Sequence, residues 1–211
     1  ILELLARHGV RASFFVPGRV AERHPGRVEG ILAAGHEVAH HGYTHTSPTR
    51  LSRAQEEDEL LRGREVLEGL GARVRGYRSP SWDLSPNTLD LLRQHGFAYA
   101  SNLMDDIVPY RHEGSGIVEL PIQWILDDAP HFMFDGASWT KKISTASEVR
   151  EIWEAEILGI REMGGLALLT MHPQIIGRPG RLPLLDATLD FVRGLDDVWL
   201  ATCGEVAEQV P

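Results

Sequence analysis

Four histidines lie close together in the stretch 35–45, and two of them, His41 and His45, are four residues apart. Neutral imidazole is the commonest metal ligand in proteins near pH 7. Two such rings on one short segment can fill two positions of a zinc-type site, where a metal makes water nucleophilic at neutral pH. The stretch therefore predicts a metal-assisted hydrolase. The spacing alone is a weak motif, because a chain with 10 histidines contains close pairs by chance.

A second candidate is His172, which follows the uncharged apolar run 166–171. That run is typical of a buried strand, and the ends of parallel strands carry the chemistry in α/β proteins. An imidazole that titrates near neutral pH suits proton donation. A histidine buried and bonded to backbone groups is an equally good interpretation of the sequence alone.

The elements that must position these residues alternate between strand-like and helix-like segments. This alternation indicates an α/β architecture with a parallel sheet, close to a small barrel. The strands are expected at 11–16, 36–40, around Tyr77, and at 97–100, 117–120, 166–171 and 198–201. The helices are expected at 20–34, 52–70, 85–96, 145–163, 184–193 and 205–210. Capping boxes at Ser52 and Thr145 mark two of the helix starts.

Length and composition bound the class of protein. The 211 residues suit a single domain, and 43% hydrophobic with 24% charged residues is typical of a globular protein. The net charge of −9 argues against nucleic acid or an anionic membrane surface as partner. The single cysteine, Cys203, excludes an intramolecular disulfide and favours a reducing, cytoplasmic location. No apolar stretch approaches the roughly 20 residues of a membrane helix.

The N-terminus begins inside a helical pattern, without an initiator methionine, and that pattern ends at Gly9. We therefore expect residues 1–211 to be one catalytic domain that is incomplete at its N-terminus. An N-terminal targeting signal therefore cannot be assessed from residues 1–211.

Four blocks of sequence together resemble the polysaccharide deacetylases, carbohydrate esterase family 4. The blocks are SFFVPG at 13–18, GHEVAHHGYTH at 35–45, GYRSPSW at 76–82 and TMHP at 170–173. Segments 120–128 and 176–182 resemble the branch with peptidoglycan-deacetylase-like and allantoinase-like members. The resemblance covers essentially the whole chain. It implies a distorted (β/α)7 barrel, with the first strand apparently lacking in this chain.

The resemblance also assigns roles to the main candidates. It implies that His41 and His45 ligate a divalent metal, usually zinc, and that His172 is the general acid. The family's third ligand is an aspartate on the first strand, and no such motif precedes Phe14 here. Arg78 would hold that aspartate ionised, because a guanidinium lowers the pKa of a nearby carboxyl group. Without the motif, Arg78 would be interpreted as a surface arginine.

Further residues are weaker candidates for binding substrate. Tyr77 and Trp82 would line the groove and stack on a sugar ring, although packing in the core explains them equally well. Asp127 and Asp128 would tune His172 or contact substrate, although a pair of loop aspartates is more often solvated.

The neighbours of the main candidates leave further alternatives open. Arg178 and Arg181 follow His172 and could bind an anionic group, although most loop arginines are solvated. His40 stands where the family commonly has asparagine, so it is either close to the metal ligands or exposed. The alternation of a strand predicts that His36 faces away from His41.

The resemblance implies N-deacetylation of an N-acetylated amino sugar or polysaccharide, in which water attacks the amide carbonyl and His172 protonates the leaving nitrogen. One alternative is hydrolysis of small cyclic amides or imides, as in allantoinase-like members. Another is a carbohydrate-binding relative without catalysis. The partner is therefore expected to be a glycan or small molecule. Related proteins tend to be homo-oligomers, and four aromatic residues could lie at a subunit contact or in the core: Trp124, Phe132, Phe134 and Trp139.

Overall fold

The computed structural model describes residues 1–211 except 135 and 138–141, so Trp139 lies outside the described residues. The chain divides into two compact units. The sheet unit comprises Leu2, Val10–Pro121 and Leu200–Pro211, and the helical unit comprises Ile1, Glu3–Gly9 and Ile122–Trp199.

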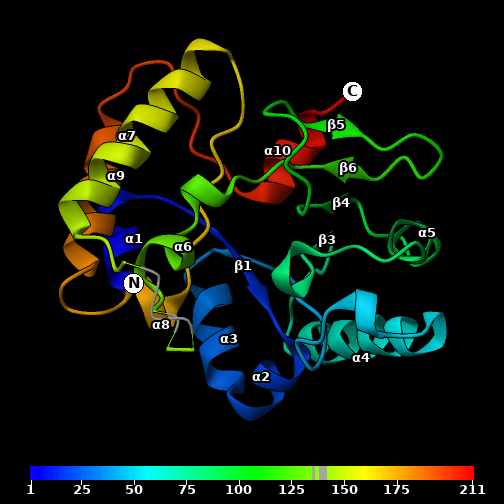
Figure 1. The fold of residues 1–211 in the computed structure, drawn as a ribbon. Helices are drawn as coiled ribbons and strands as arrows, with labels where there is room; N and C mark the ends of the chain where they lie inside the picture. The colour runs from blue at the N-terminus through cyan, green and yellow to red at the C-terminus, as the bar shows by residue number, and fades with distance from the viewer. Residues whose placement is uncertain (135, 138–141) are drawn as a thin grey trace. The chain divides into compact units, whose positions relative to one another are not determined.

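The sheet unit is built on a six-stranded sheet with the strand order β1-β2-β3-β4-β6-β5 (Figure 1). Its strands are β1 (Ser13–Val16), β2 (Glu37–His40), β3 (Gly76–Tyr77), β4 (Tyr99–Ala100), β5 (Tyr110–Arg111) and β6 (Val118–Glu119). All neighbours pair in parallel except β5, which runs antiparallel to β6. The predicted α/β architecture with a parallel sheet is confirmed. Within this unit the described strands form an open sheet.

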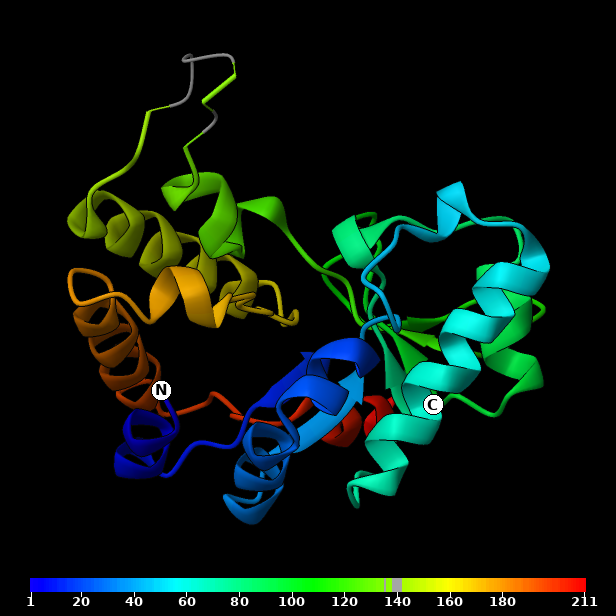
Figure 2. The ribbon, with the colours of Figure 1, turned by 90° about the horizontal axis from the view of Figure 1, so that it is seen from below.

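Helices cover the sheet and pack against one another. The sheet unit contains α2 (Gly18–Arg23), α3 (Pro25–Ala33), α4 (Arg53–Gly69), α5 (Thr88–Gln94), α10 (Cys203–Gln209) and the 3-10 turns η1 (Pro48–Arg50) and η2 (Pro80–Trp82). α4 lies against both α2 and β2 (Figure 2). The core between helices and sheet includes Val28, Val38, Leu67, Leu92 and Phe97.

Two helix predictions in this unit need correction. The segment predicted as one helix at 20–34 forms α2 and α3, with a break at His24 (φ −136°). Pro25 causes the break, because a proline disfavours helical backbone in the residue before it and lacks an amide hydrogen. The helix predicted at 85–96 begins at Thr88 and ends at Gln94. The hydroxyls of Ser85 and Thr88 both donate to Glu56 on α4.

The helical unit consists of helices joined by loops and a parallel bridge. Its helices are α1 (Leu2–His8), η3 (Trp124–Leu126), α6 (Asp128–Phe132), α7 (Ala146–Glu162), α8 (Pro173–Ile176) and α9 (Leu182–Arg193). α7 and α9 lie side by side (Figure 1). The predicted capping box at Thr145 is present. Trp153 of α7 is fully buried and donates its Nε1–H to the carbonyl of Ile125 at 3.0 Å.

Two predicted strands do not form as regular strands. Run 166–171 contributes a single parallel bridge, between Thr170 and Asp127, and 198–201 has no regular structure. A strand exists only where a neighbouring strand accepts and donates its backbone hydrogen bonds. Apolar composition predicts burial but does not supply that neighbour, and Trp199 remains 60% exposed.

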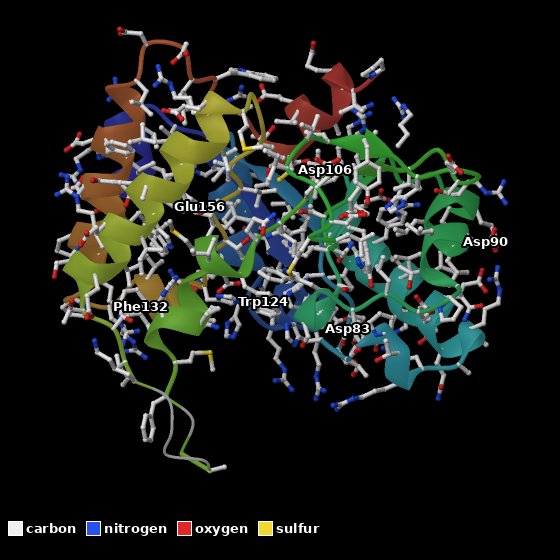
Figure 3. The ribbon with its side chains drawn as sticks, turned by 45° about the horizontal axis from the view of Figure 1, so that its top comes forward. Asp83, Asp90, Asp106, Trp124, Phe132 and Glu156 are labelled. Atoms are coloured by element: carbon white, nitrogen blue, oxygen red, sulfur yellow. The ribbon has the colours of Figure 1, made fainter. Side chains whose placement is uncertain are left out.

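The aromatic residues near η3 and α6 divide between core and surface. Figure 3 labels Trp124 on η3 and Phe132 on α6. Phe132 is buried, whereas Trp124 and Phe134 are exposed. Among these three described aromatic residues, packing in the core therefore explains only Phe132. Among the described residues, no helix combines the length and apolar character that crossing a bilayer requires.

Candidate functional site

The first part of the site is the histidine loop, residues 41–45, which follows β2 directly. The ring centroids of His41 and His45 lie 4.8 Å apart, with the ring planes at 74°. Gly42 (φ 72°) and His45 (φ 66°) both adopt left-handed backbone conformations. For His45 this conformation costs roughly 1–2 kcal/mol, so the surrounding structure must hold it. The loop thus brings the ring of His45 next to the ring of His41.

The hydrogen bonding of His41 determines which ring nitrogen faces away from the backbone. Its Nδ1 lies 2.7 Å from the carbonyl oxygen of Arg78, which can only accept, so Nδ1 carries the hydrogen. Nε2 then keeps its lone pair. Burial lowers the pKa of His41 to about 3, so the ring is neutral at pH 7. A neutral imidazole oriented by a backbone carbonyl is the usual state of a metal-ligating histidine, and the pair fits a divalent cation.

His40 lies behind the loop and is fully buried. Its ring stacks on Tyr77 at 5.5 Å, and its Nδ1 accepts the amide hydrogen of Gly42 at 3.1 Å. Burial lowers the pKa of His40 to about 3. The alternative that His40 is exposed is therefore wrong. His36 is also buried, and its Nδ1 accepts from Ala12, which lies outside the loop.

Arg78 follows β3 and is buried, so it is not a surface arginine. Its Nη2 donates to Ser101 Oγ at 2.8 Å and its Nε to the Ser101 carbonyl at 3.3 Å. The guanidinium carbon lies 4.2 Å from the centre of the Phe15 ring. Ser101 in turn donates to the carbonyl of Leu120. Residues on or directly after strands β1 and β4 thus hold the buried positive charge of Arg78, whose own backbone carbonyl orients His41.

The aromatic candidates of the third sequence block differ in environment. Tyr77 is buried in the core beside His40 and Phe97, where burial raises the pKa of its hydroxyl group. Trp82 is also buried, and it follows Ser81 with positive φ at both residues (59° and 61°). Such strained backbone concentrates at functional sites. The structure therefore places Tyr77 in packing and Trp82 on a strained turn.

The helical unit carries a second cluster, formed by Asp127, Asp128 and His172. Asp128 Oδ1 lies 2.6 Å from Nδ1 of His172, and Asp128 Oδ2 accepts the backbone amide of His172 at 3.0 Å. Asp127 Oδ1 lies 3.8 Å from the same Nδ1 and accepts the amide of Ala129 at the start of α6. Both aspartates are buried, so the interpretation as a solvated pair is wrong.

The parallel bridge explains how this cluster forms. Thr170 donates its amide to Leu126, and Asp128 donates its amide to Thr170. These two bonds align the segment before His172 with the segment before α6, which brings the three side chains together. One ligand atom from each residue lies within 4.8 Å of the others, a spacing that could also hold a cation. His172 remains partly accessible, with 38% of its side chain exposed.

The two arginines after His172 differ in exposure: Arg178 lies on the surface of the helical unit, and Arg181 is half-buried. Arg178 is exposed and donates its Nε to the carbonyl of Gln174. Arg181 donates to the carbonyl of Ile175 and lies 4.9 Å over the ring of Phe132.

Several polar residues around these groups carried no signal in the sequence. Ser101 binds Arg78, and Glu59 of α4 accepts three hydrogen bonds from the histidine loop. Glu59 lies three residues after the buried Glu56 and one before the buried Leu60, so its helical position indicates the inner side of α4. Nothing in the sequence indicates which loop it meets.

Comparison with known proteins decides the family. The family model for polysaccharide deacetylase matches residues 1–100, which include His41, His45 and Arg78. The crystal structure of a candidate polysaccharide deacetylase from Mycobacterium smegmatis is 42% identical, with a TM-score of 0.94, and the match covers 99% of this chain and 74% of that one. The chain belongs to the polysaccharide deacetylase family. The family includes metal-dependent hydrolases that act on carbon–nitrogen bonds other than peptide bonds.

Other polysaccharide deacetylase relatives cover the helical unit as well. The peptidoglycan deacetylase of Helicobacter pylori is 29% identical over 238 residues, which span 99% of this chain and 81% of that protein. The crystal structure of Puue allantoinase is 24% identical with a TM-score of 0.87, covering 98% of this chain and 69% of that one. The second likeness concerns the fold. It agrees with the predicted deacetylase and allantoinase type of fold.

Proposed function

We propose that this polysaccharide deacetylase removes the acetyl group from N-acetylated amino sugars of a glycan, with a divalent cation, zinc, at the histidine loop. The observation that carries the proposal is the pair of imidazoles at His41 and His45, with Nδ1 of His41 held by the Arg78 carbonyl. Nε2 of His41 and the ring of His45 would hold the cation. When bound, the cation would supply Lewis-acid chemistry that lowers the pKa of water.

Arg78 is proposed to have two roles near the histidine loop: it orients His41 and it provides a positive charge. Its backbone carbonyl orients His41, and its buried guanidinium provides a fixed positive charge. A positive charge favours an ionised carboxylate nearby, as the family's mechanism requires. Ser101 and Phe15 keep the guanidinium in place.

His172 is proposed as the proton donor to the leaving nitrogen. An amine leaves an acyl carbon readily only if its nitrogen is protonated as the bond breaks, so amide hydrolysis needs a general acid. The carboxylate of Asp128 accepts the Nδ1 hydrogen of His172, which places the transferable proton on Nε2. Asp127 places a second carboxylate oxygen 3.8 Å from Nδ1.

For substrate contacts, we propose that a sugar ring meets the accessible edge of Trp82, which is 8% exposed, with Tyr77 supporting the loop from behind. Asp127 and Asp128 then act mainly through His172. Arg178, exposed after His172, would meet a charged group of the substrate if one is present. A glycan partner also agrees with the net charge of −9, which disfavours nucleic acid.

The metal is tested by elemental analysis of the purified protein and of two variants, His41→Ala and His45→Ala. We expect about one equivalent of divalent metal in the unchanged protein and less than about a tenth of that in each variant, because catalytic zinc relies on few protein ligands. His24→Ala is the matched control, since His24 is exposed in the same unit. Equal metal content in all four proteins would refute the assignment.

The reaction is tested by acetate release from N-acetylglucosamine oligomers, with and without a chelator. We expect release that stops on chelation and returns when zinc is added. Acetate release that is indifferent to chelation would contradict the role of the metal. Binding of the oligomers without any release would instead favour a carbohydrate-binding relative.

A second candidate reaction is hydrolysis of small cyclic amides. The likeness to Puue allantoinase and the exposed Arg178 favour it. Hydantoin and allantoin should then be opened without release of acetate, and the oligomers should remain unchanged.

A further inference from the structure

The histidine loop makes several of its backbone hydrogen bonds with side chains. Gly42 donates its amide to His40, and the next two amides, of Tyr43 and Thr44, point at Glu59 of α4. We propose that Glu59 is a positioning residue that holds the loop in the shape required for the two imidazoles to bind one cation. The inference rests on the proposed function and adds a residue that acts through the ligands.

The contacts of Glu59 are short and converge on one side chain. Its Oε2 accepts the amide hydrogens of Tyr43 at 2.8 Å and Thr44 at 2.7 Å, and its Oε1 accepts the hydroxyl hydrogen of Thr44 at 2.7 Å. Three such bonds bind the middle of the loop, between His41 and His45.

The backbone conformation of the loop explains why it needs this support. His45 adopts φ 66°, which residues with a Cβ rarely tolerate unless surrounding contacts impose it. The residue just before it, Thr44, is held by two of the three Glu59 bonds. Without them the loop can relax towards ordinary backbone angles, and the 4.8 Å between the two ring centroids would no longer be imposed.

Helix α4 supplies a rigid base for Glu59. It begins with a complete capping box at Ser52 and packs directly on β2, the strand that leads into the loop. One turn earlier, the buried Glu56 accepts hydroxyl hydrogens from Ser85 and Thr88. The position of Glu59 is therefore determined by how α4 packs on β2, and the loop takes its shape from that packing.

The three hydrogen bonds to the histidine loop depend more on the shape of the side chain at position 59 than on its charge. In Glu59→Gln the remaining carbonyl oxygen can still accept both amide hydrogens, and the new amide group can donate to the hydroxyl of Thr44. In Glu59→Ala all three bonds are lost. The two variants therefore separate the shape of the side chain from its charge.

The test measures the loop and the metal separately, on the full chain. Amide hydrogen exchange at Tyr43 and Thr44 is followed in the metal-free protein, and the Kd for zinc is measured by competition with a chelator. Since loss of a residue that orients metal ligands typically costs about 10–100-fold in affinity, we expect Glu59→Ala to weaken zinc binding by that factor and to speed exchange at both amides. Glu59→Gln should stay within about threefold of the unchanged protein, because its amide group keeps a partner for all three hydrogen bonds.

The matched control is Glu65→Ala, which removes an exposed carboxylate from the same helix and should change neither readout. Normal exchange and normal zinc affinity in Glu59→Ala would overturn the proposal, as would an equal loss in Glu59→Gln. If the unchanged protein binds no zinc, the proposed function fails. The exchange rates still decide the role of Glu59 in that case: faster exchange in Glu59→Ala supports it, and unchanged exchange overturns it.

Discussion

In both His41 and His172 the hydrogen-bond partner of Nδ1 determines what Nε2 can do, and the two partners differ. Nδ1 of His41 donates to a neutral carbonyl, and burial keeps the ring unprotonated. Nδ1 of His172 instead donates to the carboxylate of Asp128 at 2.6 Å. The first arrangement suits a metal ligand and the second suits a group that holds and delivers a proton.

The role of Asp128 leads to a prediction for Asp128→Asn. The amide keeps the size of the side chain, but it replaces one of two acceptor oxygens, which serve Nδ1 and the backbone amide of His172. We expect kcat for acetate release to fall by about 10²–10⁴-fold, the range for a misoriented or missing acid–base group, with normal metal content. Steady-state kinetics and elemental analysis measure the two quantities.

The control for this prediction is Asp196→Asn, an exposed aspartate of the same unit, which should leave kcat unchanged. A drop in kcat of less than tenfold for Asp128→Asn would show that Asp128 does not prepare His172 for proton transfer.

Among the elements, α4 supports the histidine loop because it packs closely against β2, the strand before the loop. Gly63 makes this approach possible: a Cβ at this position would lie 2.3 Å from Nε2 of His40. The same helix places Glu56 against the start of α5 and Glu59 against the histidine loop. Thus one helix connects the strand that carries His40, the loop that follows it and the next helix of the sheet unit.

The close contact at Gly63 predicts that Gly63→Ala lowers the free energy of unfolding. Overpacking of a core typically costs about 1–3 kcal/mol, whereas replacing glycine by alanine in a helix gains about 1 kcal/mol. We expect the cost to be larger here, because the ring of His40 is fully buried and cannot move away from the new methyl group. Denaturant unfolding measures the change.

Gly159→Ala is the matched control, because Gly159 lies in α7 and a Cβ added there would meet no atom within 4 Å. That variant should gain about 0.5–1 kcal/mol from helix propensity. Equal effects of the two substitutions would show that the contact with His40 does not limit the packing of α4.

At the scale of the whole molecule, two histidines with lowered pKa values, the buried His40 and the half-buried His41, couple stability to pH. His40 and His41 have pKa values of about 3 in the folded chain, because burial disfavours the charged ring, against about 6.5 when unfolded. Between these values the unfolded rings bind protons and the folded rings do not. Acid therefore favours unfolding throughout this range, and the stabilisation that the neutral rings allow is fully present only above about pH 6.5.

We predict that the free energy of unfolding of the metal-free protein falls as the pH drops from about 6.5 towards 3. Each ring should contribute a slope of up to about 1.4 kcal/mol per pH unit. His40→Asn keeps an acceptor for the amide of Gly42 but does not titrate. It should therefore lower the slope of the free energy of unfolding against pH by the contribution of one histidine. Denaturant unfolding at several pH values measures it, and an unchanged slope in His40→Asn would contradict the prediction.

Local patterns predicted much of the fold. The capping boxes at Ser52 and Thr145 and the alternation of strands and helices are properties of neighbouring residues, and the structure contains them. The strand predicted at 166–171 failed because strand formation depends on a distant partner, and only Thr170 found one. The break at Pro25 was present in the sequence, but the apolar pattern on both sides obscured it.

By itself, the sequence determined the family, the α/β class and the candidate groups at 41, 45, 78, 127, 128 and 172, because motifs and periodicity are written along the chain. Only the tertiary structure decided which nitrogen of His41 keeps its lone pair, that Asp128 is buried against His172, and that Glu59 binds the histidine loop. The physical reason is that protonation, burial and hydrogen bonding depend on groups far apart in the chain, whose meeting only the packing of helices and strands determines.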